Sequence, residues 1–271
     1  MTPALFPRSF RREYLEAVRG EGCYVFDSRG RKYLDAAGGA AVVSIGHGVA
    51  EIGRAMARQA AELEFAHTSQ FHTAIAERLA ARLRALAPPA FREAGRVWFT
   101  SGGSEATETA IKLVRQYWVE RGQPSRTRIV SRWQSYHGST LGALALSGNL
   151  RRRAIYAPLL PEWGHIAPCY CYRCPLGLTF PDCRVACADE LETLLTDVGP
   201  QSVAAFIFEP AVGATLGAVA PPDGYLQRIA EIARRHGILL IADEVMTGMG
   251  RTGKNFAVEH WGITPDLILV G

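Results

Sequence analysis

Two short segments carry the residue types of a binding site for a phosphorylated, aromatic ligand. Residues 100–106 read TSGGSEA, in which glycines allow a close backbone approach and Ser104 adds a hydroxyl group. A helix that begins there would add free N–H groups and the positive end of its dipole, which favour an anion. Residues 135–140 read SYHGST, and the ring of Tyr136 could lie flat on an aromatic ligand. A capped glycine-rich turn and a core tyrosine are the plainer alternatives.

Two acidic residues follow apolar runs that have the pattern of buried strands. Asp243 follows residues 238–242, and Glu209 follows residues 203–208. Because the carboxyl ends of parallel strands form the ligand-binding edge of an α/β sheet, we expect both side chains at one polar pocket. A buried carboxylate is costly unless it is paired, and Asp243 beside a protonated ring nitrogen would be paired. A helix cap or salt bridge for Asp243, and a loop brace for Glu209, are the alternatives.

The glycines at residues 248–253 match the dinucleotide pattern G-x-G-x-x-G, and with Lys254 they nearly match a nucleotide phosphate loop. The first pattern joins a strand directly to a helix, whereas these glycines start several residues after the apolar run and no amphipathic stretch follows. The second needs a hydroxyl residue after its lysine, where this chain has Asn255. A nucleotide-binding protein is therefore a minor alternative.

Five of the six cysteines fall in one short segment, at Cys169, Cys171, Cys174, Cys183 and Cys187. Their spacing allows three interpretations: a surface loop with free or partly buried thiols, a structural metal site, or disulfide bridges. A cytoplasmic location disfavours disulfides. We expect the surface loop, with no metal, and we expect the segment to be dispensable for the chemistry.

The stretches between these motifs alternate apolar runs with amphipathic patterns, which predicts an α/β protein with a mainly parallel sheet. The expected strands are residues 96–100, 128–132, 203–208, 238–242 and 267–270. Apolar stripes at helical spacing predict helices near residues 51–63, from residue 75, from residue 106 and from residue 226. Pro88-Pro89, Gly122 and Gly237 mark helix ends.

The first 50 residues have a different pattern. Residues 23–26 and 32–34 flank the turn sequence DSRG at residues 27–30, which predicts a hairpin. We therefore expect an N-terminal segment over residues 1–50 and a large domain over residues 51–271.

The composition excludes several classes of protein. The chain has 271 residues, of which 48% are apolar and 21% charged, with a formal net charge of +4. These values exclude a disordered chain, a collagen-like repeat and a small disulfide scaffold. No apolar run reaches the ~20 residues of a membrane span and the start lacks a signal-peptide pattern, so we expect a soluble, cytoplasmic protein. The basic run at residues 151–153 is too short for a nucleic-acid interface.

In this order, the motifs resemble those of the class III aminotransferases, and in particular their omega-type branch. Those proteins are pyridoxal-phosphate enzymes with the type I transferase fold, whose large domain has a mainly parallel sheet of the seven-stranded type. The resemblance covers nearly the whole chain and rests on residues 20–27, 33–35, 46–47, 99–106, 136–138, 209–210, 222–226 and 243–253. It implies that residues 1–50 belong in part to the small domain and that residues 38–47 line the substrate side.

The resemblance implies roles for individual residues. Tyr136 and Val245 would lie on opposite faces of the pyridine ring. Asp243 would pair with the protonated ring nitrogen and keep the ring an electron sink, with Glu209 in support, so that these two acids are the expected catalytic residues. The expected cofactor-binding residues are Gly102, Gly103, Ser104, Tyr136, His137, Asp243 and Val245.

The resemblance also implies a Schiff-base lysine immediately after Gly271. The three lysines of the chain fit that role poorly, and Lys254 is the least unsuitable of Lys32, Lys112 and Lys254. We therefore expect the protein to continue beyond Gly271 with a lysine that carries the cofactor, and a truncated chain is the alternative.

Two positions concern the substrate. The ornithine and 4-aminobutyrate branches carry a glutamate where this chain has Ala214 and a glutamine where it has Met246. Both differences make the pocket less polar, as in the omega branch. The implied partners are an amine or omega-amino acid, a 2-oxo acid such as pyruvate or 2-oxoglutarate, and a second copy of the chain in a homodimer. A non-catalytic protein with the same fold is the alternative.

Overall fold

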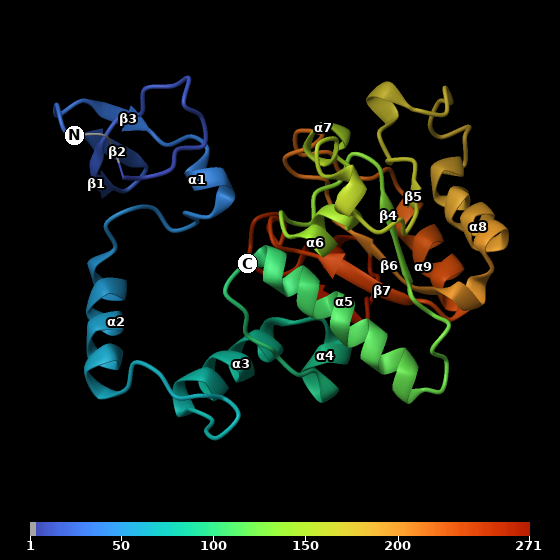
Figure 1. Cartoon of the computed structure of the whole chain (residues 1–271), viewed down its shortest axis with the longest axis horizontal. Helices are drawn as coiled ribbons and strands as arrows, with labels where there is room; N and C mark the ends of the chain where they lie inside the picture. The colour runs from blue at the N-terminus through green and yellow to red at the C-terminus, as the bar shows by residue number, and fades with distance from the viewer. Residues whose placement is uncertain (1–3) are drawn as a thin grey trace. The chain divides into compact units, whose positions relative to one another are not determined.

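The computed structural model describes residues 4–271, and the chain divides between residues 74 and 75 into two compact units. The first unit contains an antiparallel sheet of β1 (Ala17–Glu21), β2 (Tyr24–Asp27) and β3 (Lys32–Leu34), followed by α1 (Gly38–Ala41) and α2 (Ala50–Glu62) (Figure 1). The predicted hairpin is confirmed. Its turn is held by the buried Asp27 carboxylate, which accepts hydrogen bonds from the backbone N–H groups of Arg29 and Arg31 at 3.0 and 2.9 Å. The boundary expected at residue 50 stays a prediction.

The second unit is built on a five-stranded sheet in the order β5-β4-β6-β7-β8, and every neighbouring pair is parallel. The strands are β4 (Arg128–Arg132), β5 (His165–Ile166), β6 (Val203–Phe208), β7 (Leu239–Asp243) and β8 (Leu267–Leu269). The mainly parallel sheet is confirmed, and β4 and β6 have the predicted bounds. Strand β5 was not predicted, because a two-residue strand leaves no periodic pattern in the sequence.

The strand predicted at residues 96–100 is wrong. These residues form neither a helix nor a strand and pair with no strand in the part of the chain that the structure describes, and Trp98 is 79% exposed. A strand needs a neighbour for its backbone hydrogen bonds, and a β-type sequence pattern does not supply one.

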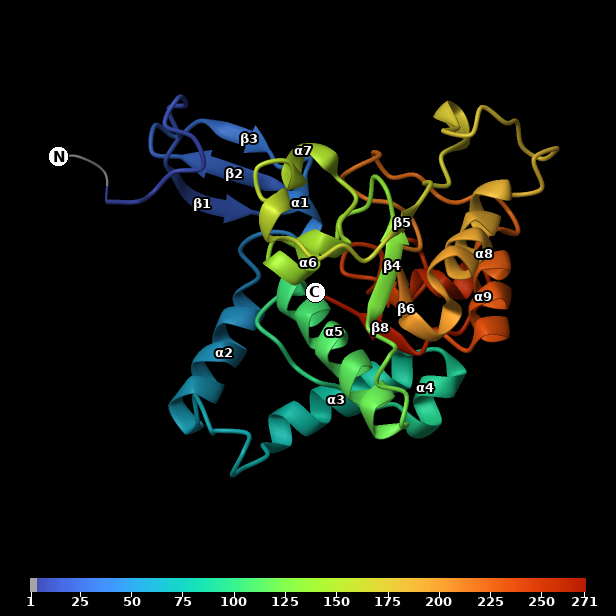
Figure 2. The ribbon, with the colours of Figure 1, turned by 45° about the vertical axis from the view of Figure 1, so that its right-hand side comes forward.

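Helices cover both faces of the parallel sheet. Helices α5 (Gly103–Glu120) and α6 (Leu141–Leu146) lie on one side, and α8 (Ala186–Val198) and α9 (Tyr225–His236) on the other (Figure 2). Side chains alternate along β6, so Phe206 and Phe208 join the core under α8 and α9 while Ala205 and Ile207 join the core under α5. A strand that is covered on both faces has a continuous apolar sequence, and β6 has one.

Within residues 4–271 the remaining helices are α3 (Ala74–Leu86), α4 (Pro89–Ala94) and α7 (Leu150–Arg153), with four short 3₁₀ segments. The predicted helices near residues 51–63, 75, 106 and 226 correspond to α2, α3, α5 and α9. Within residues 4–271 no helix combines the length and the apolar character that crossing a membrane requires.

Candidate active site

The centre of the candidate site is a buried aspartate at the carboxyl end of β7. Asp243 is 5% exposed, and its Oδ2 lies 2.7 Å from Nδ1 of His137. The other carboxylate oxygen accepts a hydrogen bond from the backbone N–H of Val245 at 3.1 Å. The imidazole of His137 is itself buried, and its Nε2 has no hydrogen-bond partner among the described residues. The aspartate is therefore held in one orientation by a group 106 residues away in sequence.

Glu209 ends the neighbouring strand and braces two loops. Its Oε1 accepts a hydrogen bond from the backbone N–H of Tyr136 at 3.1 Å, and its Oε2 accepts one from Gly213 at 3.0 Å. Burial raises the pKa of this carboxyl group, and the Asp243 charge adds to the rise, whereas His137 opposes it. Both oxygens are thus occupied by backbone donors, which supports the alternative that Glu209 positions the Tyr136 segment.

The first residues of α5 lie where the sequence predicts an anion site, and that role stays a prediction. Gly102 is the N-cap and Gly103 begins the helix, so the first N–H groups of an 18-residue helix have no partner within the helix. The Ser104 hydroxyl accepts a hydrogen bond from the backbone N–H of Ser139 at 3.0 Å. The Thr107 hydroxyl donates to the carbonyl of His137 at 2.7 Å. These bonds join the TSGGSEA and SYHGST motifs into one site.

Gly138 explains why the two motifs can approach so closely. Its φ is +138°, and an added Cβ would lie 2.7 Å from the Ser104 hydroxyl oxygen and 2.7 Å from Cβ of Ala143. No larger residue fits between the SYHGST turn and the start of α5.

The side chain of Val245 packs against two glycines, Gly103 at the start of α5 and Gly271. An added Cβ at Gly103 would lie 3.0 Å from Cγ1 of Val245, and one at Gly271 would lie 2.8 Å from the same atom. The start of α5, the turn after β7 and the last residue of the chain are therefore in contact. All the expected cofactor-binding residues, together with Glu209, lie in the second unit and meet at the carboxyl edge of its sheet.

Glu244 determines the course of the glycine-rich loop at residues 248–253. Its buried carboxylate accepts hydrogen bonds from the backbone N–H groups of Ala257 and Val258 at 3.0 and 2.9 Å and from the Thr247 hydroxyl. The loop consists of turns and is followed by a four-residue 3₁₀ segment at Ala257–His260 rather than by an α-helix. The strand–glycine–helix geometry of a nucleotide site is therefore absent from this stretch.

None of the three lysines occupies the place expected for a cofactor-bearing side chain. Lys112 is exposed and lies about 14 Å along α5 from its first residue. The Lys32 ammonium group lies 3.6 Å from the centroid of the Tyr24 ring, in the first unit. Lys254 is exposed in the loop after Gly253.

Sequence reasoning missed Arg132, which is 1% exposed. One guanidinium nitrogen donates to the backbone carbonyl of Glu209 and another to Sγ of Cys169 at 3.2 Å. Within residues 4–271 it forms no ion pair with a carboxylate. A charged residue at the end of an otherwise buried strand was the available signal.

Solved structures with the same architecture are transaminases. An omega-transaminase from Thermomicrobium roseum, described as thermostable and (S)-enantioselective, superposes with a TM-score of 0.91 at 39% identity, over 99% of this chain and 60% of that one. The omega transaminase from Pseudomonas jessenii in complex with PMP gives a TM-score of 0.93 at 32% identity, over 99% of this chain and 60% of that one. The fold is that of the type I pyridoxal-phosphate transferases.

The family follows from the sequence comparison. The chain belongs to the class III aminotransferases, because the family model described as "Aminotransferase class-III" matches residues 6–271. The uncharacterized aminotransferase YodT of Bacillus subtilis is 43% identical over 251 residues, which are 93% of this chain and 56% of that protein. The chain thus spans less than two thirds of the length of these relatives.

Proposed function

We propose that this protein is a pyridoxal-phosphate-dependent aminotransferase of the omega type, which transfers an amino group from an amine or omega-amino acid to a 2-oxo acid. The observation that carries the proposal is the buried Asp243 carboxylate, which His137 holds at the carboxyl end of β7, beside the N-terminus of α5. An anion site and a fixed carboxylate at one edge match the two ends of a phosphorylated pyridine.

The residues present fit the cofactor on structural grounds. The free N–H groups at the start of α5 and the Ser104 hydroxyl suit a phosphate. The close approach of Gly103 to Val245 leaves no room for a side chain at the helix start, so backbone atoms line the site there. When bound, the cofactor would supply the electron sink for loss of the substrate Cα proton.

Asp243, His137 and Tyr136 would orient the cofactor and polarise its pyridine ring. Asp243 would hold a proton on the ring nitrogen, and His137 would keep the carboxylate aimed at it. The guanidinium carbon of Arg152 lies 4.6 Å from the centroid of the Tyr136 ring, and the Tyr136 hydroxyl is 2.8 Å from that of Ser139. Both contacts restrain the Tyr136 ring, which would stack on the cofactor, while Glu209 fixes the Tyr136 backbone.

The two substrate-related positions lie at the loop that Glu209 braces. An added Cβ at Gly213 would lie 2.7 Å from Sδ of Met246, and Ala214 is the next residue along the chain. A thioether and a methyl group here support an apolar amine or omega-amino acid as donor. Pyruvate or 2-oxoglutarate would be the acceptor, and a cytoplasmic homodimer completes the proposal.

The decisive experiment is turnover. The purified protein should be yellow with bound cofactor and should convert pyruvate or 2-oxoglutarate into the matching amino acid when an amine is supplied. A colourless protein that retains no cofactor would contradict the proposal. A yellow protein without turnover over a panel of amines would favour the non-catalytic alternative. Sedimentation at micromolar concentration tests the homodimer, which a fully active monomer would contradict.

Tyr136→Ala tests the stacking position. The variant should stay folded and lose cofactor faster on dialysis, with a weakening of affinity of about fivefold, the equivalent of ~1 kcal/mol for an aromatic pair. Tyr156→Ala is the matched control, because Tyr156 lies in the segment after α7 and has no expected role at the site. Equal retention in the two variants would contradict the stacking role.

A further inference from the structure

A buried positive charge lies at the carboxyl end of β4. Arg132 is the last residue of that strand and is 1% exposed, and within residues 4–271 no carboxylate forms an ion pair with it. A buried charge without an ionic partner costs stability, and an apolar side chain of similar volume is often more favourable in its place. The guanidinium group is therefore better explained by a functional role than by stability.

The pairing of β4 with β6 ends just before this point. The last pair of that ladder joins Val130 to Phe206, and beyond it β6 pairs only with β7 within the described residues. The Arg132 side chain reaches across from β4 and donates from one guanidinium nitrogen to the backbone carbonyl of Glu209. The side chain thus continues the link between the two strands where their backbone hydrogen bonds stop.

Glu209 is held twice by the segment that follows β4. Its carbonyl accepts the hydrogen bond from Arg132, and its Oε1 accepts the one from the Tyr136 N–H at 3.1 Å. Between these two contacts, the Ser135 hydroxyl donates to the carbonyl of Arg132 at 2.8 Å and closes the turn. The Arg132 side chain, the turn and Glu209 therefore form a closed ring of contacts, which fixes the direction in which Tyr136 leaves the sheet.

The other neighbours of Arg132 are uncharged. The Cys169 sulfur accepts a hydrogen bond from a second guanidinium nitrogen at 3.2 Å, and the guanidinium carbon lies 5.8 Å from the centroid of the Tyr225 ring. Burial raises the pKa of the Cys169 thiol and of the Tyr225 hydroxyl, so both groups are neutral at neutral pH. Of these contacts among the described residues, only Glu209 belongs to an acid.

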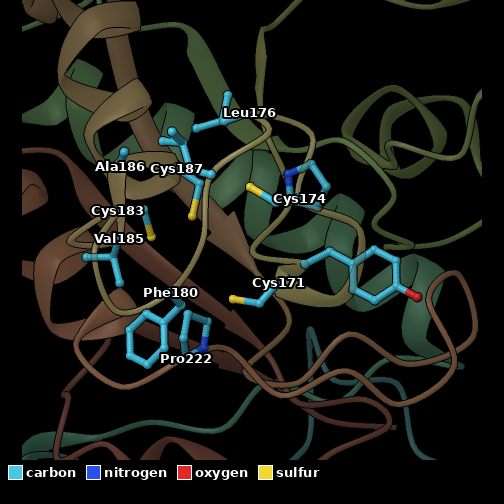
Figure 3. Close-up of a pocket in the computed structure, with 12 residues that line it drawn as sticks. Cys171, Cys174, Leu176, Phe180, Cys183, Val185, Ala186, Cys187 and Pro222 are labelled. Carbon is cyan, nitrogen blue, oxygen red and sulfur yellow. The ribbon is translucent and has the colours of Figure 1, made fainter.

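The cysteine-rich loop between β5 and α8 does not balance this charge either. Four of the cysteines of this region line a separate small cavity, as Figure 3 shows: Cys171, Cys174, Cys183 and Cys187. Burial raises the pKa of Cys187 to about 12 and also raises the pKa of Cys171, so these two thiols are neutral at neutral pH. Cys169 does not line that cavity and contacts Arg132 instead.

Arg132 also acts on the charge of the Glu209 carboxyl group. Burial raises the pKa of this group, and the Asp243 charge adds to the rise. His137, the Gly213 N–H and Arg132 oppose it. The ionised carboxylate accepts two backbone N–H groups, whereas a protonated carboxyl group would present a donor on one of its oxygens. A buried cation nearby therefore favours the form of Glu209 that holds both loops.

We infer that Arg132 is a positioning residue of the cofactor site, whose buried guanidinium group clamps the Glu209 backbone so that Glu209 holds Tyr136 in its stacking position. The inference rests on the proposed function, because the partner of the Tyr136 ring is the pyridine ring of the cofactor. Arg132 is not among the expected cofactor-binding residues and acts through Glu209. A ring that is held before the cofactor binds leaves less ordering to be done on binding, which strengthens it.

Binding of pyridoxamine 5′-phosphate, measured by equilibrium dialysis of the purified protein freed of its cofactor, tests the inference. Arg132→Met should weaken binding about threefold to fivefold and no more than Tyr136→Ala, because both changes act on the same ring. Arg132→Lys keeps a positively charged donor and should recover part of the loss. Arg126→Met is the matched control and should leave binding unchanged, since Arg126 donates to the carbonyl of Val203 at 2.8 Å, at the opposite end of β6.

A double variant separates positioning from a general distortion of the site. In a protein that already carries Tyr136→Ala, Arg132→Met should cause no further loss of affinity, because no ring is left to position. A further loss as large as the one in the otherwise unmodified protein would overturn the inference. Unchanged binding in the single Arg132→Met variant would overturn it as well.

Hydrogen exchange in the cofactor-free protein keeps the test valid if Arg132→Met fails to fold. In Arg132→Lys one ammonium nitrogen replaces the two guanidinium nitrogens that contact Cys169 and Glu209. The backbone N–H groups of residues 133–139 should therefore exchange severalfold faster than in the unmodified protein, and Arg126→Lys should not change them. Equal exchange in Arg132→Lys and the unmodified protein would overturn the inference. An unmodified protein that binds no pyridoxamine 5′-phosphate would contradict the proposed function, and faster exchange in Arg132→Lys would still support the clamp.

Discussion

The carboxyl edge of the sheet and the cysteine-rich loop both bury groups that can carry charge, but only the first supplies partners for them. At the edge, Glu209 and Glu244 accept backbone N–H groups, and Asp243 is held by His137. In the loop the thiols face one another, and within residues 4–271 only Cys169 has a side-chain donor, Arg132. The edge therefore holds its buried carboxylates with donors from within the chain, whereas the loop keeps its thiols neutral, because burial raises the pKa of Cys171 and Cys187.

Among the three acids at the edge there is a second difference. Glu209 and Glu244 are saturated by loop backbone and act as braces, whereas Asp243 is oriented by one imidazole and one N–H. A buried acid whose donors are backbone N–H groups of loops holds those loops in place. A buried acid aimed by a side chain remains able to act on a bound group, which is why we assign the chemistry to Asp243.

The largest effect is expected from Asp243→Asn. The amide cannot hold a proton on the ring nitrogen, so the transamination rate should fall by at least about 10³-fold. Asp266→Asn is the matched control, because Asp266 accepts the Leu240 N–H at 2.8 Å at the opposite end of β7. Steady-state kinetics check both variants, and equal losses in the two would contradict the assignment.

Substitutions of His137 test whether its imidazole orients the Asp243 carboxylate. His137→Phe removes a hydrogen bond to a charged group, worth roughly 1.5–3 kcal/mol, so the rate should fall about 10- to 100-fold. His137→Gln retains an N–H donor and should recover part of the loss. A general packing defect would not be rescued by the amide, so equal rates in the two variants would show that His137 is structural.

Glu244→Gln tests whether the buried Glu244 carboxylate stabilises the loop whose backbone N–H groups it accepts. The amide group would turn an N–H toward a backbone donor, so the free energy of unfolding should fall by about 1–3 kcal/mol. Glu231→Gln, on the exposed face of α9, removes only surface ion pairs and should cost less than ~1 kcal/mol. Urea denaturation measures both, and similar values would contradict the brace role.

The smallest effect concerns pH and His165, which lies on β5. Burial and the Arg153 charge lower the pKa of His165 from 6.5 to about 4. Between these values the unfolded chain binds a proton that the folded protein does not, so stability should decline as the pH falls from about 6.5 to about 4. His165→Phe keeps the stacking on Trp133, whose ring is 4.2 Å away, and should show a shallower decline in urea titrations at each pH. An unchanged slope would contradict the contribution of His165.

Some elements could be predicted because their signal is local. The apolar stripe of α9 and the continuous apolar run of β6 are properties of single segments, and both elements lie where they were expected. Residues 96–100 have an equally good strand pattern but no strand partner in the described chain. A local pattern thus shows what a segment is able to form, and pairing decides whether it forms.

The sequence by itself determined the fold class, the family resemblance and the residue types at the candidate site, because these depend on motifs within a few residues. Only the tertiary structure decided which residues meet. It paired His137 with Asp243 across 106 residues, placed Glu209 on the Tyr136 backbone and separated Cys169 from the other four thiols. The physical reason is that the order β4-β6-β7 brings the turns after these strands to one edge, and strand order is set by packing of the whole sheet.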